Sequence, residues 1–112
     1  MTISIVVPVH NEAENIQPLL DEIVVALVDC NAYEIIYIND GSSDETAQAL
    51  AQAQKKLPQL RVFEHQRSCG QSAAVYTGIK AAKYPFIATL DGDGQNNPAD
   101  IPVLFKHLKE QR

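Results

Sequence analysis

The sequence has no tryptophan, only two cysteines and no cluster of lysine and arginine. Two cysteines are too few for a disulfide scaffold. Cys30 and Cys69 also lack the CxxC spacing and the nearby histidines of a zinc site, so we expect reduced thiols. A net charge of -5 without a basic cluster argues against a nucleic-acid partner, although an acidic domain can still bind a nucleotide through a metal ion.

Long apolar runs are also missing. No stretch approaches the roughly 20 apolar residues that span a bilayer, and residues 1–10 lack the basic and apolar parts of a signal peptide. The sequence therefore predicts a chain that is neither exported nor inserted into a membrane, with a cytoplasmic location. Apolar material is nevertheless abundant, because 46% of the 112 residues are hydrophobic, which is enough for the core of one domain.

Short β-branched runs alternate with helical patterns along the whole chain. Strands are predicted at 3–9, 33–38, 60–64 and 86–90, and helices follow each of them. Four strand-helix units predict an α/β, Rossmann-like fold with a mostly parallel sheet and helices on both faces. The chain stops on the helix predicted for 101–112. It is therefore either a complete small domain or the first part of a longer enzyme.

The helix starts can be predicted from capping residues. The expected caps are Asn11 with Glu14, Ser42 with Glu45, and Asn97 before Pro98. The helix predicted for 70–83 is expected to bury one face, made of Val75, Ile79 and Ala82.

Acidic residues collect where the predicted strands end. In a parallel sheet these ends lie on one edge, where ligands bind. Glu12 follows the first strand, Asp40 the second, and Asp91 and Asp93 the fourth. Gathering these carboxylates costs like-charge repulsion, which a cation or a donor-rich ligand would offset. Asp40 before a Gly-Ser pair also fits a simple turn.

Asp91 and Asp93 are the strongest candidates for a functional role. Gly92 and Gly94 let a bulky anionic group approach the backbone there. Two carboxylates at this spacing, followed by Gln95, offer the oxygen ligands that suit Mg²⁺ or Mn²⁺. The histidines, by contrast, have no ligand spacing and are expected to be structural or solvated: His10, His65 and His107.

Four segments in order resemble the N-terminal half of inverting family 2 glycosyltransferases with the GT-A fold. They are "SIVVPVHNEAENI", "IIYINDGSSDET", "GQSAAVYTGIKAA" and "ATLDGDGQNNP", and together they cover essentially the whole chain. The nearest branch is that of the polyprenyl- and dolichyl-phosphate hexose synthases. Two positions depart from the common pattern: His10 replaces a frequent Tyr, and Ser68 replaces a frequent Asn.

The resemblance implies roles for individual residues. Asp40 would accept hydrogen bonds from the base edge, and Asp91 would face the ribose or diphosphate. A divalent cation, Mg²⁺ or Mn²⁺, would be held by Asp93 and Gln95, with Asp91 beside them. The rest of the nucleotide pocket would be lined by Pro8, His10 and Glu12.

The resemblance also implies a chemistry. A hexose would pass with inversion from a UDP- or GDP-sugar to an acceptor, for which this branch of the family suggests a polyprenyl phosphate at the cytoplasmic face of a membrane. The catalytic base and the acceptor half would lie beyond residue 112, so residues 1–112 would be the donor-binding part. Two other readings stay open: a non-catalytic nucleotide-binding fragment, and a receiver-type phosphoacceptor domain.

Overall fold

The structure is a computed structural model that describes residues 2–90, in which strands and helices alternate. The strands are β1 (Thr2–Val9), β2 (Ala32–Asp40), β3 (Leu60–His65) and β4 (Ile87–Thr89). The helices are the short 3-10 helix η1 (Ala13–Asn15), α1 (Ile16–Ala26), α2 (Thr46–Lys56) and α3 (Gln71–Ala81). The helix predicted for 101–112 lies outside the described residues. None of the described helices combines the length and the apolar character needed to cross a membrane.

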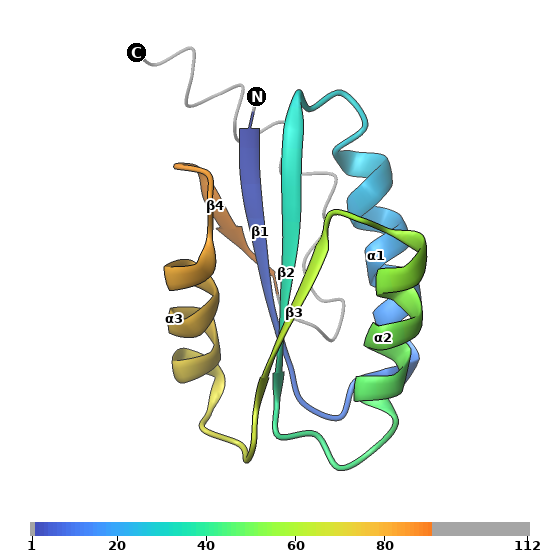
Figure 1. Ribbon diagram of the computed structural model, residues 1–112, viewed down its shortest axis with the longest axis vertical. Helices are drawn as coiled ribbons and strands as arrows, with labels where there is room; N and C mark the ends of the chain where they lie inside the picture. The colour runs from blue at the N-terminus through green and yellow to red at the C-terminus, as the bar shows by residue number, and fades with distance from the viewer. Residues whose placement is uncertain (1, 91–112) are drawn as a thin grey trace.

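The four strands form one parallel sheet in the order β3-β2-β1-β4. Helices α1 and α2 cover one face and α3 covers the other (Figure 1). The α/β prediction is therefore confirmed. This order is that of a Rossmann half-fold, whereas a receiver domain has the order 2-1-3. The receiver alternative is wrong for this reason.

The core has two layers because successive strand residues point to opposite faces of the sheet. Ile5, Val7 and Tyr37 belong to the larger layer beneath α1 and α2. Val6 and Ile38 belong to the smaller layer beneath α3. Strands β1 and β2 are thus buried on both faces, which suits their content of β-branched residues.

The predicted buried face of α3 is partly wrong. Ala82 does pack on the smaller layer, but Ile79 is 45% exposed, and the fully buried positions are Ala74 and Gly78. A Cβ on Gly78 would overlap the Val6 side chain and lie 2.8 Å from Ile38 Cδ1. The helix lies so close to the sheet that only small residues fit beneath it, which turns the larger Ile79 outward.

Candidate functional site

The loops that follow β1 and β2 bind each other at the carboxyl edge of the sheet. Asn11 Oδ1 accepts a hydrogen bond from Ser43 N–H at 2.8 Å, and Asn11 N–H donates to Ser42 Oγ at 2.9 Å. Asn11 adopts a left-handed backbone with φ of 55°, which asparagine tolerates better than most residues. Both side chains therefore serve this junction between loops.

The first two capping predictions are wrong for the same reason. Helix α1 begins at Ile16 and α2 at Thr46, and neither has a side-chain cap at the residue before it. Asn11 and Ser42 bond across the two loops instead of to their own helices. At α2, Asp44 Oδ1 accepts from Thr46 N–H at 2.9 Å, so the aspartate two residues before the helix binds the first N–H group of the helix. The third expected cap, Asn97, lies outside the described residues.

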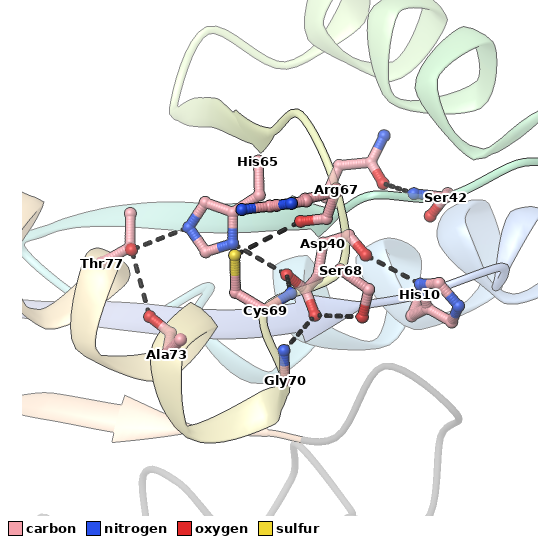
Figure 2. A network of polar contacts seen from close by, with 11 residues as sticks. His10, Asp40, Ser42, His65, Arg67, Ser68, Cys69, Gly70, Ala73 and Thr77 are labelled. Carbon is pink, nitrogen blue, oxygen red and sulfur yellow. Dashed lines mark hydrogen bonds and ion pairs between the residues drawn. The ribbon is translucent and has the colours of Figure 1, made fainter.

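Asp40, the last residue of β2, is the centre of a polar network at this edge (Figure 2). Asp40 is buried, with 4% of its surface exposed. Oδ1 accepts from His65 Nδ1 at 2.8 Å and from Cys69 N–H at 2.9 Å. Oδ2 accepts from Ser68 Oγ at 3.1 Å and from Gly70 N–H at 2.9 Å. Four donors occupy a group that offers about four lone-pair positions.

These donors fix the ionisation of Asp40. Burial by itself raises the pKa of this carboxyl, because it disfavours the charged form. The hydrogen bonds from Cys69 N–H, His65, Gly70 N–H and Ser68 outweigh that effect and lower the pKa of Asp40 to about 2. Asp40 is therefore a charged acceptor across the neutral pH range.

Two glycines allow the loop after β3 to close on Asp40. Gly41 has φ of 66°, and a Cβ there would overlap backbone atoms of Arg67 and Ser68. Gly70 has φ of 97° and is the residue before α3. The left-handed backbone of both residues is open to glycine at little cost. The segment from Arg67 to Gly70 can therefore lie directly against the end of β2.

His10, one of the predicted nucleotide-pocket residues, joins the same network from the loop after β1. Its Nδ1 donates to the backbone carbonyl of Asp40 at 2.7 Å, while the residue itself is exposed (Figure 2). Its neighbour Asn11 contacts Nε2 through Nδ2 at 3.4 Å. The structure thus brings the predicted residues His10 and Asp40 together.

The other two predicted pocket residues of this loop lie near it in different surroundings. Pro8 is buried within β1, where its register partner is Ile38. Glu12 is half-buried: its Oε2 accepts from Asn15 Nδ2 at 2.7 Å, and its N–H donates to Thr46 Oγ1 at 3.1 Å. Glu12 therefore links η1 to the start of α2.

The remaining predicted ligands follow β4, after the last described residue. Leu90 N–H donates to Val6 O at 3.0 Å, which keeps the end of this segment beside β1. Asp91, Asp93 and Gln95 themselves lie outside the described residues. Their roles remain predictions.

His65 and Cys69 are the functional-site residues that the sequence reasoning undervalued. Cys69 was expected to have no histidine nearby, and this expectation is wrong. Ligand atoms of Asp40, His65 and Cys69 all lie within 4.8 Å of one another, because the loop after β3 folds back over the strand end. The HxxxC spacing of the two residues was the available signal. The structure confirms a structural role for His65, which is bonded to both Asp40 and Thr77.

The three side chains could share a metal ion in principle, but hydrogen bonds already engage all of them. Asp40 accepts four hydrogen bonds, His65 contacts a partner with each nitrogen, and Cys69 Sγ donates to Arg67 O at 3.4 Å. In this structure the group acts as a hydrogen-bonded junction. It joins the ends of β2 and β3 to the start of α3.

A second buried carboxylate lies at the opposite end of β2. Glu34 accepts from Ser4 Oγ at 2.6 Å, from Lys83 N–H at 2.6 Å and from Arg61 Nη1 at 2.7 Å. Burial raises its pKa, but the hydrogen bonds from Lys83 N–H, Ser4 and Arg61, together with the guanidinium charge, outweigh burial and lower it. This ion pair fixes the amino edge of the sheet, away from the loops described above.

Comparison with known proteins gives a consistent result. The sequence profile described as Glycosyl transferase family 2 matches residues 4–112. Dodecaprenyl-phosphate galacturonate synthase of Rhizobium johnstonii is 39% identical over 99% of this chain and 33% of its own length. Undecaprenyl-phosphate 4-deoxy-4-formamido-L-arabinose transferase of Photorhabdus laumondii is 36% identical over 96% of this chain and 34% of its own length. The chain thus spans about a third of the curated relatives it matches.

Solved structures show the same fold. The mannosyltransferase PcManGT of Pyrobaculum calidifontis, solved with GDP-Man and Mn²⁺, aligns with a TM-score of 0.78 at 24% identity, over 88% of this chain and 29% of that one. S. aureus TarS 1-349, solved with UDP-GlcNAc, aligns with a TM-score of 0.80 at 25% identity, over 98% of this chain and 32% of that one. The expected GT-A fold is therefore confirmed.

Proposed function

The chain belongs to glycosyl transferase family 2, and from that premise we propose that residues 1–112 are the donor-binding part of an inverting glycosyltransferase. The donor is a UDP- or GDP-hexose, and the acceptor is a polyprenyl phosphate presented at the cytoplasmic face of a membrane. Relatives named for dodecaprenyl- and undecaprenyl-phosphate support this acceptor class.

One observation carries the proposal. The exits of β1, β2 and β3 converge on Asp40, through His10 from the first loop and His65 and Gly70 from the third. In open parallel sheets, ligands bind at this edge, and the reversal of strand order falls between β1 and β4. In the sequence, the predicted ligands Asp91, Asp93 and Gln95 come shortly after β4, one of the two strands that flank this reversal. We therefore expect a nucleotide to bind at this edge, beside the Asp40 network.

The divalent cation would be Mg²⁺ or Mn²⁺. Asp93 and Gln95 would hold it with Asp91 beside them, and a donor set made only of oxygens suits both ions. When bound, the cation would supply charge stabilisation for the departing nucleoside diphosphate. A neighbour in fold solved with GDP-Man and Mn²⁺ supports a divalent metal.

The chain's own described residues would bind and orient the nucleotide. His10 offers an exposed ring for stacking, held in place by its bond to the Asp40 carbonyl. Asp40 would read the base edge. Because its oxygens already accept four hydrogen bonds, a donor on the base would have to share one of them. The base that deprotonates the acceptor is expected beyond residue 112, unless the acceptor is already anionic.

The alternative of a non-catalytic nucleotide-binding fragment is favoured by one fact. The chain spans about a third of the length of its curated relatives, and the acceptor half is expected in the remainder. Both hypotheses predict nucleotide binding, whereas only the first predicts sugar transfer when the remaining two thirds are supplied.

Calorimetric titration with UDP and GDP, with and without Mn²⁺, tests the shared part of the proposal. We expect binding that depends on the metal, and we expect Asp93→Ala to abolish the metal-dependent component. Glu22→Ala, an exposed acid on α1, is the matched control and should bind like wild type. Equal affinity with and without metal would count against the role of Asp93.

A further inference from the structure

The hydrogen bonds of the junction formed by Asp40, His65 and Cys69 differ in how easily a cation could replace them. Cys69 is exposed, and its Sγ makes the longest of these bonds, to Arg67 O at 3.4 Å. The shortest joins His65 Nδ1 to Asp40 Oδ1 at 2.8 Å, and here a proton lies between a nitrogen and an oxygen that are both common metal ligands. These two bonds are the ones that a metal ion could take over.

The three ligand atoms are close enough for one ion. They lie within 4.8 Å of one another at the end of β2 (Figure 2). Zinc–ligand bonds of about 2.0–2.3 Å in a tetrahedral arrangement place neighbouring ligand atoms roughly 3.3–3.6 Å apart, so side-chain shifts of about 1 Å would reach that geometry. Cys69 is the residue whose side chain can make this shift, because it is exposed, while its N–H bond to Asp40 Oδ1 at 2.9 Å keeps its backbone in place.

Asp40 can bind an ion through Oδ1 and keep its other partners. An ion between Oδ1 and the Nδ1 of His65 would replace one of the four donors on the carboxylate. The remaining donors are Ser68 Oγ and the N–H groups of Cys69 and Gly70. The ion would therefore meet a carboxylate that the backbone already holds in position, and a preorganised ligand loses little freedom on binding.

Thr77 can support His65 as a metal ligand. Its hydroxyl hydrogen can be donated to Ala73 O at 3.1 Å, which leaves the Thr77 oxygen able to accept from Nε2 at 2.9 Å. A neutral imidazole with its proton on Nε2 has the lone pair of Nδ1 available for a metal ion. Histidines that bind metals almost always donate their other N–H in this way, which fixes the tautomer and the orientation of the ring.

The three ligand types favour zinc. Sulfur and imidazole nitrogen suit Zn²⁺, whereas Mg²⁺ and Mn²⁺ prefer oxygen ligands. The Asp40 carboxylate and a Cys69 thiolate together balance the two positive charges of Zn²⁺, so little net charge is brought to the buried end of β2. Three protein ligands leave one tetrahedral position for a water molecule. A surface pocket lined by Glu64 and Arg67 together with His65 and Cys69 gives the ion access.

We propose that Asp40 Oδ1, His65 Nδ1 and Cys69 Sγ form a Zn²⁺ site at the carboxyl edge of the sheet. On binding, the Cys69 thiol releases its proton to solvent, and the imidazole keeps its proton on Nε2. The site uses none of the residues predicted to hold Mg²⁺ or Mn²⁺ after β4. Because Asp40 is assigned to the base edge of the nucleotide, bound Zn²⁺ would compete with the donor, a consequence that rests on the proposed function.

Titration of the full chain with Co²⁺ tests the site without any nucleotide, because Co²⁺ occupies zinc sites and a cobalt–thiolate bond gives a charge-transfer absorption band. We expect this band in wild type, and we expect Zn²⁺ to displace the Co²⁺ and abolish it. Cys69→Ala should lose the band while its main-chain N–H still bonds Asp40, so the edge keeps its shape. Cys30→Ser removes the only other cysteine of the chain and should keep the band.

Competition with Co²⁺ also measures the affinity for Zn²⁺. His65→Gln should weaken it by more than the roughly 10–100-fold that the loss of a supporting contact costs, because a ligand itself is lost. Absence of the band in wild type, or a band that survives in Cys69→Ala, overturns the inference. An affinity that His65→Gln leaves unchanged overturns the assignment of His65 as a ligand.

Binding of GDP and UDP with Mn²⁺ gives the second readout. At a free Zn²⁺ concentration about ten times its dissociation constant, competition should lower the nucleotide affinity about tenfold in wild type but not in Cys69→Ala. An equal effect of Zn²⁺ on both proteins overturns the competition at Asp40. Absence of any nucleotide binding instead overturns the proposed function, while the cobalt band still decides on the zinc site.

Discussion

Strand β2 begins and ends near a buried carboxylate, and the two carboxylates are held differently. Glu34, near the amino end, is 3% exposed and pairs with the guanidinium of Arg61. Asp40, at the carboxyl end, is 4% exposed and pairs with the imidazole of His65. The guanidinium of Arg61 gives the first network a permanent cation. The second network relies on hydrogen-bond donors from the His65 ring, the Ser68 hydroxyl and two main-chain N–H groups.

The difference extends to the backbone. Glu34 receives one main-chain N–H, from Lys83, while Asp40 receives two consecutive ones, from Cys69 and Gly70. The second pair belongs to a loop that depends on two glycines with positive φ. The amino edge of the sheet, where we place no ligand, is thus held by the ion pair between Arg61 and Glu34. A loop with special backbone geometry forms the edge where we place the ligand.

Breaking the Arg61–Glu34 pair should have the largest effect on stability. Arg61→Ala leaves a buried carboxylate without its cation, at a cost of about 3 kcal/mol in the free energy of unfolding. Arg61→Lys keeps the charge but not both contacts, to Glu34 and to Ala81 O, and should fall in between. Urea unfolding measures both variants. A loss no larger than that of Lys55→Ala, an exposed control on α2, would show that Glu34 does not need its partner.

The Asp40 network should show itself at acid pH. The pKa of Asp40 in the folded chain, about 2, lies below its usual value of 3.8, so its stabilisation is complete above about pH 4 and is lost as the pH falls through about 2. We expect Asp40→Asn to remove about 2 kcal/mol of this acid-dependent stability. Thermal unfolding across this pH range tests it, with Asp29→Asn as the control for one exposed carboxylate. Parallel pH profiles of wild type and Asp40→Asn would contradict the low pKa.

A substitution in α3 should perturb both networks, by a smaller amount. Gly78→Ala places a methyl group against Val6 and Ile38. Overpacking costs roughly 1–3 kcal/mol, while replacing a helical glycine regains about 1 kcal/mol, so we expect a net loss of about 1 kcal/mol. Ser72→Ala, at an exposed position of the same helix, should cost nothing measurable. Chemical denaturation that finds Gly78→Ala as stable as wild type would show that α3 can move away from the sheet.

Sequence reasoning predicted the strands well, because strands in a parallel sheet are rich in β-branched residues, and Ile3 to Val9 and Tyr33 to Ile38 contain several of them. It placed the buried face of α3 incorrectly, since hydrophobic periodicity favoured Ile79 over Gly78. Close approach to a sheet selects for small size. The residues that β1 and β2 present to the helix decide this, and they are distant in sequence.

The candidate site was predicted in part. Asp40 was identified from its place at a strand exit, and it is the centre of the observed network. His65 and Cys69 were undervalued because their partner is more than 20 residues away in the sequence. Asn11 and Ser42 matched a local capping pattern but bond across loops. A local pattern does not show which partner a polar side chain finds in space.

The hydrogen bonds to the two carboxylates also fix the length of the segment that contains α3. Gly70 N–H reaches Asp40 and Lys83 N–H reaches Glu34, so the segment that contains α3 is tied to β2 before its first turn and after its last. The strand between the two acids spans about 20 Å. The eleven residues of α3 span about 16 Å at helical rise, and the non-helical residues at its two ends cover the remainder. Inserting or deleting one residue in α3 would move one tie by about 1.5 Å and rotate it by about 100°. The two hydrogen bonds therefore fix the length of α3, because a longer or shorter helix would break one of them.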